Sequence, residues 1–526
     1  MDTEPRDPGG RDPEPRRNVP PLLRLLGEAP ERRVLAFALA ANLALTLAAA
    51  LASDSVFQVD EYFQTVEFAS YKLGVTPAAD LPWEFQARIR PFAQPALYWA
   101  LARGAAKAGV EDPFALLRVF RIASGLIAWL ALAALMRAAG RWFPERPWRA
   151  AMYASLALPY FVPYLAARTS SENLATAFLL LGLALVAWGE EPGGGWIRSF
   201  SAGASLGLAV ECRLQVAMSV AGVLLWTLVH GRGRLRSALL VALGLAAALL
   251  AGFVVDRWGY GTPEFVAWNY FRVNVLEGKA ATFGVLPVVA YPFVFMLLFP
   301  PFGALIFLGM AIFWWRSPRH LLTWVTVPFV LGHSLVGHKE FRFMFPILAP
   351  ATLCLVLLWA RPRTAPGRLS SVLRALETTW FGRATLAWNA LAALALCLLP
   401  SSDNFGLQRY FHDHAADPVR WAGFTDPRRP HGIAAPFLWP KPGPPVQLVK
   451  SAEELSRIVS ESDRPVLVPA KFPLPPGAAA FLESHGERVF VSLPPFVSRL
   501  NLFHWVDRAD LTYVYRVDRG PPPASR

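Results

Sequence analysis

Long apolar runs, separated by short polar connections, follow one another from residue 34 to residue 400. The first run, residues 34–52, carries no charge and is long enough to cross a bilayer as a helix. Applied to the later runs, the same criterion predicts about ten to twelve transmembrane helices. We therefore expect an all-α polytopic membrane domain over residues 34–400. The later apolar segments lie near 92–109, 116–136, 150–167, 174–188, 200–229, 237–255, 286–315, 320–337, 343–360 and 384–400.

The residues on either side of the first run predict its orientation. Residues 1–33 mix proline, arginine and acidic residues without periodicity, which predicts a disordered tail. Arg32 and Arg33 directly precede the run, so the positive-inside rule places the tail in the cytoplasm and the far end outside. The sequence Ala-Leu-Ala at 50–52 resembles a signal-peptidase site, but the long tail and the long apolar run favour an uncleaved anchor.

Two other stretches differ from the membrane pattern. Residues 53–91 are polar but rich in aromatic side chains, which predicts a first extracytoplasmic loop of short amphipathic helices at the interface. Residues 401–526 are polar, charged and proline-rich, and we expect them to form a small soluble α/β domain. Counting spans places this domain on the extracytoplasmic face. Its expected strands lie at 446–449, 466–468, 489–491 and 511–517, and a helix is expected to start at Ser451.

The composition supports a membrane protein and excludes several other classes. Hydrophobic residues make up 54% of the 526 residues, and the mean hydropathy of +0.35 is too high for a soluble chain of this length. The net charge of +13 suits loops held against an anionic leaflet, since no basic run is interleaved with aromatic residues as in nucleic-acid binding. The three cysteines all lie within apolar runs, which excludes a fold built on disulfides.

The first candidate for chemistry is an acidic cluster just beyond the first span. On a helix Asp60, Gln64 and Glu67 would share one face, at offsets of four and seven residues. A partly desolvated carboxylate there is suited to act as a general base towards a hydroxyl group, with Glu61 as the reserve candidate. A solvated acidic loop explains the spacing equally well.

The second candidate is the sequence HKEFRF, which lies between two apolar segments. Charged groups at the edge of a bilayer are costly and usually mark a site. On a helix His338, Lys339 and Arg342 would direct their donors at one point, which suits a phosphate, and Glu340 would hold the cations in place. Two alternatives are a loop whose cations snorkel to the interface, and a metal site with His333, which lacks a convincing set of further ligands.

Other polar groups between apolar runs extend this picture. Residues 167–173, with Arg168 and Asn173, form a polar segment that also suits ordinary helix capping. Arg213 lies beside Glu211 in an apolar run, where it either forms a buried ion pair or binds an anion. The aromatic and amide-rich stretch 258–274 has the side chains that bind sugars, although an interfacial belt would look similar.

These motifs together resemble the family 22 mannosyltransferases, which use polyprenyl-phosphate-mannose. The strongest match is HKEFRFMFPILAP at 338–350, which fits the family signature HKExRFxxPxxP at every fixed position. VDEYFQTVEFA at 59–69 and LPWEFQARIRPFAQP at 81–95 resemble the family's first-loop motifs. ARTSSEN at 167–173 and the stretch 258–275 match more loosely. The sequence departs from the family pattern at Gln58-Val59 and at residues 283–285, and these departures bear on the acceptor pocket.

The resemblance implies a class C glycosyltransferase fold and metal-independent, cofactor-independent transfer of mannose with inversion, on the extracytoplasmic or lumenal face of a membrane. Its substrates would be a polyprenyl-phosphate-linked sugar donor and a glycan or glycolipid acceptor. Asp60 would be the catalytic base. The implied phosphate ligands are His338, Lys339, Arg342, Arg168 and Arg213, and the implied substrate-binding residues are Gln64, Glu67, Trp83, Glu84, Arg90, Asn173, Asn274 and Glu340.

Two other functions remain open at this point. A transferase of the same fold could use another lipid-phosphate sugar. A transporter or flippase for a lipid-linked sugar would also collect charges within the membrane. A transporter, however, needs polar groups near span centres and internal repetition, whereas these motifs lie at span ends and no repeat is visible in the sequence.

Overall fold

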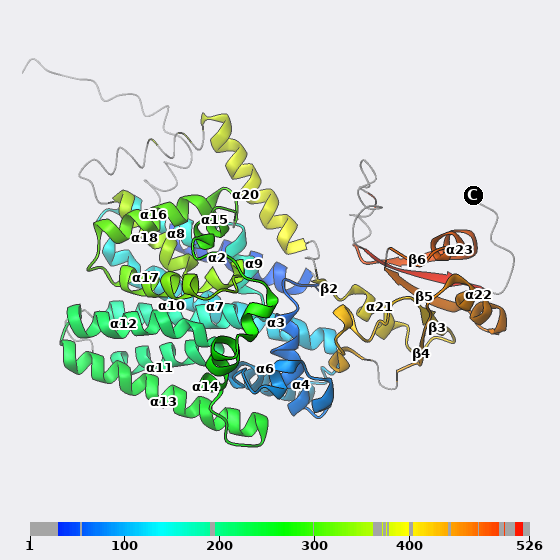
Figure 1. Cartoon of the computed structure of the whole chain (residues 1–526). Helices are drawn as coiled ribbons and strands as arrows, with labels where there is room; N and C mark the ends of the chain where they lie inside the picture. The colour runs from blue at the N-terminus through cyan, green and yellow to red at the C-terminus, as the bar shows by residue number, and fades with distance from the viewer. Residues whose placement is uncertain are drawn as a thin grey trace, which may run out of the picture.

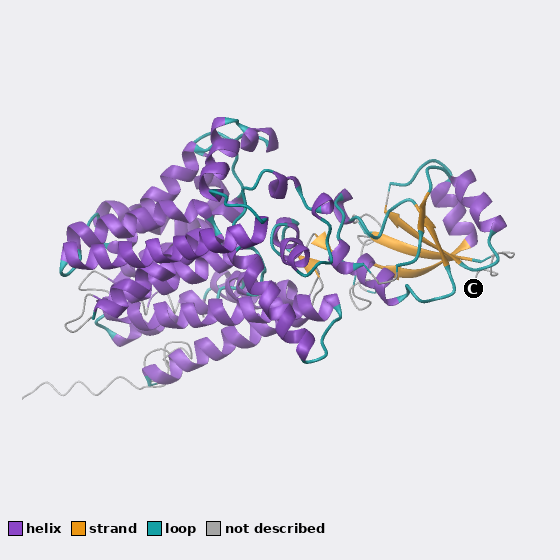
Figure 2. Cartoon of the chain, turned by 90° about the horizontal axis from the view of Figure 1, so that it is seen from below, coloured by secondary structure: helices purple, strands orange, loops and turns teal. Residues whose placement is uncertain are grey.

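The chain folds into a large helical bundle and a smaller sheet-containing part beside it (Figures 1 and 2). In this computed structural model the first transmembrane helix and the first loop are followed by helices that run through the bundle, and the sheet comes last. The expected disordered tail lies outside the described residues except for its last four positions. The structure describes residues 30–52, 55–189, 195–297, 299–360, 371, 375, 378–398, 403–439, 443–471, 473–493, 499 and 511–518.

Most of the predicted apolar segments are helices. The first, α2, begins at Glu31, three residues earlier than expected, because Glu31 pairs with Arg149 of the bundle at 3.0 Å. The longer helices of the bundle are α2 (Glu31–Ala52), α6 (Ala93–Lys107), α7 (Pro113–Ala139), α8 (Arg146–Ala157), α10 (Ser171–Gly189), α11 (Trp196–Cys212), α12 (Ala217–His230), α13 (Arg234–Tyr260), α16 (Phe302–Arg316), α17 (Leu321–Leu335), α18 (Leu348–Ala360) and α20 (Trp380–Leu398).

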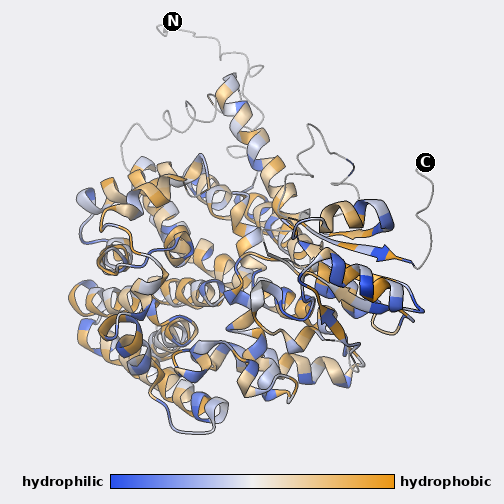
Figure 3. Cartoon of the chain, turned by 45° about the vertical axis from the view of Figure 1, so that its right-hand side comes forward, coloured by the Kyte–Doolittle hydropathy of each residue, from blue (hydrophilic) through white to orange (hydrophobic). Residues whose placement is uncertain are grey.

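The bundle is that of an integral membrane protein. Among the described residues, five helical stretches are long and apolar enough to cross a membrane, and three shorter helical stretches are also apolar. Hydrophobic residues dominate these helices in Figure 3. Large side chains such as Leu239, Leu250 and Trp315 are exposed on them, as expected for helices that face lipid.

Three predicted segments are each divided. The segment 150–167 becomes α8 and α9 (Phe161–Ala166), with the non-helical residues 158–160 between them. The segment 200–229 becomes α11 and α12, because Arg213 adopts an extended conformation between them. The segment 286–315 becomes α15 (Ala290–Leu297) and α16, which lie on either side of Pro300 and Pro301. The break leaves Arg213 between two helical segments.

Glycines allow α11 and α13 to pack closely. A Cβ atom at Gly203 would collide with the backbone carbonyl of Val241, and one at Gly244 would collide with that of Phe200. Small residues at such crossings let helix backbones approach within the membrane, where packing rather than the hydrophobic effect drives association.

The first loop forms short helices, as predicted. They are α3 (Asp60–Phe63), α4 (Val66–Lys72), η2 (Ala78–Asp80) and α5 (Trp83–Gln86). The loop starts with strand β1 (Ser55–Val56), which pairs antiparallel with β2 (Asp403–Asn404) from the beginning of the C-terminal part. The first loop and the C-terminal part are therefore joined through these two strands.

The C-terminal part contains a mixed five-stranded sheet in the order β4-β3-β5-β7-β6. Strands β4 (Val446–Leu448), β5 (Val466–Lys471), β6 (Gly486–Val491) and β7 (Thr512–Val517) match the sequence expectation, whereas β3 (Arg420–Gly423) was not foreseen. Helix α22 (Ala452–Glu461) starts as predicted, with the Ser451 hydroxyl accepting from the Glu454 N–H. Helices α21 (Gly406–Asp413) and α23 (Ala478–His485) complete this part.

Candidate functional site

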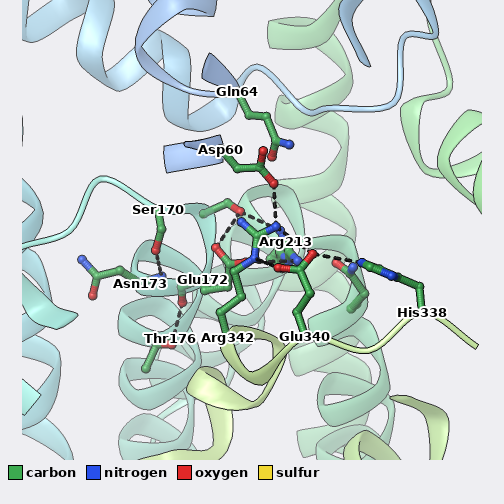
Figure 4. Close-up of polar contacts among 12 residues, drawn as sticks. Asp60, Gln64, Ser170, Glu172, Asn173, Thr176, Arg213, His338, Glu340 and Arg342 are labelled. Atoms are coloured by element: carbon green, nitrogen blue, oxygen red, sulfur yellow. Dashed lines mark hydrogen bonds and ion pairs between the residues drawn. The ribbon is translucent and has the colours of Figure 1, made fainter. Parts of the chain in front are cut away.

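The first loop and the HKEFRF segment meet at one point of the structure. Asp60 is the first residue of α3, and Arg342 lies in the 3₁₀ helix η7 (Phe341–Ile347) that precedes α18. The Nη2 atom of Arg342 donates to Oδ2 of Asp60 at 2.6 Å, although the two residues are 282 positions apart (Figure 4). The tertiary structure thus brings the two strongest sequence motifs together.

Arg342 is surrounded by carboxylates. Its Nε atom donates to Oε2 of Glu340 at 2.6 Å and lies 3.7 Å from Oε1 of Glu172. Glu340 also pairs with Nε2 of His338 at 3.0 Å. One buried guanidinium therefore bridges three acidic side chains from three different elements, which fixes the geometry of the cluster.

The expected helical arrangement of His338, Lys339 and Arg342 is wrong. Helix α17 ends at Leu335, and η7 starts only at Phe341 after an extended Glu340. The Lys339 Nζ atom donates to the backbone carbonyls of Leu286, at 3.1 Å, and Val336. In an extended chain neighbouring side chains point in opposite directions, so Lys339 turns away while Glu340 contacts Arg342 and His338 contacts Glu340.

Glu172 and Arg213 form the second half of the cluster. Glu172 lies in the first turn of α10, where the helix N-terminus stabilises a negative charge. The Nη2 atom of Arg213 lies 3.1 Å from Oε1 of Glu172, and its Nη1 atom donates to the Ser171 hydroxyl at 3.1 Å. Arg213 thus pairs with Glu172, and not with the neighbouring Glu211 that the sequence suggested.

Asp60, Arg213, His338, Glu340 and Arg342 border a cavity of about 490 Å³. A cavity of this volume can hold a small ligand. The residues that the sequence nominated and that line the cavity are Asp60, Gln64, Trp83, Glu84, Arg90, Arg213, Asn274, His338, Glu340 and Arg342. The other nominated residues, Glu61, Glu67, Arg168, Asn173 and Lys339, are not among its lining residues.

Glu61 and Arg168 are buried next to residues of the site without lining the cavity. Glu61 is 1% exposed; its Oε1 atom accepts from the Phe57 N–H and lies 3.7 Å from Nη1 of Arg168. Burial raises the pKa of Glu61, against the opposing effect of Arg168. The Thr169 hydroxyl donates to the Glu61 carbonyl at 3.1 Å, so the 167–173 segment holds the start of the first loop.

Asn173 has a similar supporting position. Its side-chain amide donates to the carbonyls of Ala166 at 2.8 Å and Arg168 at 2.7 Å. The residue also lines a second, mainly apolar cavity among α2, α7, α8, α10 and α18. Asn173 therefore shapes the polar turn that carries Glu172 and has no place in the lining of the polar cavity.

Glu67 does not share a face with Asp60, contrary to expectation. Helix α3 ends at Phe63, and α4 starts in a new direction at Val66. Glu67 is fully buried and accepts from the hydroxyl groups of Tyr62 and Thr76, each at 2.5 Å. Burial raises the pKa of Glu67 to about 7.

The 81–95 stretch supplies another wall of the cavity. Glu84 accepts from the Gln64 side-chain amide at 2.8 Å and lies 3.7 Å from Nη2 of Arg90. Burial raises the pKa of Glu84, against the attraction of Arg90. Trp83 stacks on Phe283 with ring centroids 6.1 Å apart, which places an aromatic surface at the same cavity.

The environment of Asp60 keeps it ionised. Burial alone would raise its pKa, but the guanidinium groups of Arg342 and Arg90 outweigh this effect and hold the pKa below its ordinary value. The pKa of Glu340 is likewise lowered, because hydrogen bonding and attraction from Arg342 outweigh burial. The cavity thus presents carboxylates as acceptors and guanidinium groups as donors at neutral pH.

Several residues of the site were not nominated from the sequence. Gln215, Tyr270 and His333 line the cavity. Glu172 is not among the lining residues, but it contacts both Arg213 and Arg342. It stands inside the 167–173 motif, where an acid at a helix N-terminus next to basic motifs was a usable signal. The described residues contain no group of three or more metal-ligating side chains around His333 or elsewhere.

The comparisons with known proteins identify the family of this chain. A family profile described as the Alg9-like mannosyltransferase family matches residues 37–419. The chain belongs to this family. Among Alg9-like relatives, GPI mannosyltransferase 3 of Candida albicans is 26% identical over 306 residues, which cover 57% of this chain and 59% of the relative. GPI mannosyltransferase 3 of Yarrowia lipolytica is 26% identical over 325 residues, which cover 58% of each chain. The chain thus spans less than two thirds of these curated relatives.

A solved structure shows that the fold of this Alg9-like protein is the class C glycosyltransferase fold. The apo crystal structure of ArnT from Cupriavidus metallidurans superposes with a TM-score of 0.50 at 14% sequence identity. The match covers 93% of this chain and 99% of ArnT. The fold class predicted from the sequence motifs is confirmed, including a smaller C-terminal part that contains a sheet.

Proposed function

We propose that this protein transfers a mannosyl residue from a polyprenyl-phosphate-mannose donor to a glycan or glycolipid acceptor. The observation that carries the proposal is the 2.6 Å contact between Asp60 and Arg342 in a cavity of about 490 Å³. The cavity combines a carboxylate that can accept the proton of a hydroxyl group with guanidinium groups that can bind a phosphate. Family membership and the names of the relatives support mannose as the transferred sugar.

Asp60 is the catalytic base in this proposal. It lines the cavity with a side chain that is 28% exposed, whereas Glu61 is buried behind it. Asp60 accepts the proton of the acceptor hydroxyl as that oxygen attacks the anomeric carbon of mannose. The bond between this carbon and the phosphate oxygen breaks, and its electron pair leaves with the lipid phosphate. Attack from the opposite face converts a β-linked mannosyl phosphate into an α-mannoside.

Arg342 and Arg213 bind the phosphate group in this proposal. In the structure both are paired with carboxylates, Arg342 with Asp60 and Arg213 with Glu172. A donor phosphate competes with Asp60 for Arg342, and guanidinium groups bind phosphate oxygens through two parallel hydrogen bonds. Loss of its contact with Arg342 raises the proton affinity of Asp60 just when it must act as a base. Donor binding and activation of the base are thereby linked.

The cavity faces the extracytoplasmic or lumenal side in this proposal. Arg32 and Arg33 lie in the first turn of α2, which the positive-inside rule places at the cytoplasmic end. Asp60 follows the other end of α2 and is held next to Arg342. The C-terminal part, joined to the first loop through β1 and β2, lies on the same side.

The test is a transfer assay with purified protein in lipid nanodiscs. Synthetic polyprenyl-phosphate-mannose and a panel of mannosides are the substrates, with glucose- and aminoarabinose-linked donors for comparison. We expect an α-mannoside product, identified by its anomeric NMR coupling and by α-mannosidase digestion. Transfer from another donor but not from the mannose donor would overturn the sugar assignment. Movement of the lipid-linked sugar across the bilayer without transfer would favour the flippase alternative.

A further inference from the structure

A segment from beyond the family match forms part of the cavity wall. The family profile ends at residue 419, yet Ile433 lines the cavity together with Asp60 and Phe63. Ile433 and the 3₁₀ helix η9 (Pro436–Leu438) belong to the loop between β3 and β4 of the C-terminal part. A part of the chain beyond the family match therefore reaches the candidate site.

This segment is packed into the first loop. Ala435, Phe437 and Leu438 are buried in one hydrophobic cluster with Tyr62 and Phe63 of α3, and Ile433 packs against that cluster. The Phe437 ring also stacks on Phe120 of α7, with centroids 6.4 Å apart. Buried aromatic contacts of this kind hold a segment in one place.

A buried hydrogen bond connects the segment to Glu67. The Phe437 N–H donates to Oε1 of Glu67 at 3.4 Å, the same oxygen that accepts from the Tyr62 hydroxyl. Tyr62 directly follows Asp60 and Glu61 in α3. Glu67, which has no place in the lining of the cavity, therefore joins the C-terminal segment to the helix that carries the candidate base.

The other end of the segment is braced within the C-terminal part. The carbonyl of Arg428 accepts from the Ala435 N–H at 3.1 Å and from the Trp439 indole at 2.9 Å. Upstream, Phe405 packs on Tyr62 with ring centroids 4.8 Å apart. The cavity wall at Ile433 is thus held from both sides and is preorganised for a ligand.

We propose that Ile433, held in place by residues 434–438, forms part of the acceptor-facing wall of the cavity and limits the size of the acceptor sugar next to the reacting hydroxyl. This inference rests on the proposed function. The acceptor hydroxyl must approach Asp60, and Ile433 packs against the cluster of α3 residues that flank Asp60. Figure 4 shows Asp60 and Gln64 above Arg342, with Glu172 to the left of Arg342 and Glu340 to its right.

The position of the segment in the C-terminal part also favours contact with the acceptor over contact with the donor. The donor is held in the bilayer by its polyprenyl chain, whereas residues 433–438 belong to the extramembrane C-terminal part. The glycan of an acceptor extends from the membrane and can meet such a segment. Glu67 is then a positioning residue, since it acts through Phe437 and does not touch the substrate.

The experiment compares Ile433→Ala and Ile433→Trp with the wild type. Donor KM, acceptor KM and kcat are measured with a linear mannoside and with one that carries a branch next to the accepting hydroxyl. We expect Ile433→Trp to raise the acceptor KM for the branched mannoside about tenfold or more. We expect Ile433→Ala to reduce the difference in KM between the branched and the linear mannoside. The donor KM should stay within about twofold. Leu448→Ala and Leu448→Trp, on the exposed strand β4, are the matched controls.

Glu67 is tested by a pair of variants. Glu67→Gln keeps a carbonyl oxygen for the Phe437 N–H, whereas Glu67→Ala does not. We expect Glu67→Ala to raise the acceptor KM at unchanged donor KM, and Glu67→Gln to restore it. A purely structural role would instead lower the fraction of active protein and leave both KM values unchanged.

The outcomes separate this inference from the proposed function. Suppose that the wild type transfers a sugar but the Ile433 variants change the ratio of the KM values for the two acceptors by less than about twofold. The inference about the acceptor wall is then refuted, and the proposed function stands. An equal change in donor KM would also refute the inference. If the wild type transfers no sugar, the proposed function fails, and direct titration of the two mannosides decides the inference. The inference would then be overturned if the wild type and Ile433→Trp bound the branched mannoside with equal affinity.

Discussion

Replacing Asp60 by asparagine should abolish most of the transfer while the protein stays folded. The amide has the same shape and still accepts a hydrogen bond from Arg342, but it cannot accept the proton of the acceptor hydroxyl. Loss of a general base lowers rates by about 10²–10⁴-fold. This range corresponds to about 3–5 kcal/mol of transition-state stabilisation.

The structure indicates that folding tolerates this change. The Asp60 side chain is 28% exposed, and Arg342 keeps its contacts with Glu340 at 2.6 Å and with Glu172 at 3.7 Å. Loss of one partly exposed partner should therefore cost about 1 kcal/mol of stability or less. The donor KM should stay constant or fall, because the phosphate no longer competes with a carboxylate for Arg342.

The assay is single-turnover transfer from polyprenyl-phosphate-mannose, with thermal unfolding measured on the same samples. Asp80→Asn is the matched control, since Asp80 lies in the same loop and outside the cavity lining. Glu61→Gln should lower stability, because it removes a buried partner of Arg168, but should keep more activity per folded molecule than Asp60→Asn. Asp60→Asn activity within a few fold of the wild type would refute the assignment and make Glu61 the candidate base.

Four further outcomes are expected. Arg342→Lys should raise the donor KM by about tenfold or more with little change in acceptor KM, since lysine cannot replace the guanidinium fork; an effect on acceptor KM alone would contradict the phosphate role. The pKa of Glu67 is raised to about 7, so its stabilising contribution is complete below its ordinary value of 4.5 and is lost as the pH rises through 7. The thermal stability of Glu67→Gln minus that of the wild type should therefore be larger at pH 8 than at pH 5. A stability difference that does not change with pH would show that Glu67 does not titrate in this range. Activity should persist in EDTA, and a loss that manganese or magnesium reverses would overturn the metal-independent mechanism. Cysteines at the exposed Ala79 and Glu461, in a background without the three native cysteines, should both react with an impermeant reagent from the extracytoplasmic side; labelling from the cytoplasm would reverse the orientation.

Sequence reasoning succeeded where structure depends on near neighbours. Apolar runs of membrane length predicted the bundle, since a spanning helix satisfies its own backbone hydrogen bonds. The Ser451 hydroxyl caps α22 as predicted, because a cap needs only the next three residues. The family motif at 338–350 nominated Arg342 and Glu340, which both line the cavity.

Two predictions were wrong because they assumed that a helix continues beyond the residue where it ends. Asp60 and Glu67 were expected on one face, but α3 ends at Phe63. Lys339 was expected beside Arg342, but an extended stretch turns it towards backbone carbonyls. Helix ends depend on how the short loop helices pack on the bundle, and no local pattern in the sequence specifies that packing.

The sequence by itself determined that this is a membrane protein of a recognisable glycosyltransferase type, with its polar motifs at the ends of spans. Only the tertiary structure decided which charges meet. Arg342 bridges Asp60, Glu172 and Glu340, and Ile433 reaches the same cavity from the C-terminal part. The physical reason is that buried charges need partners and cavities need walls, and both come from whichever distant segments the packed bundle brings into contact.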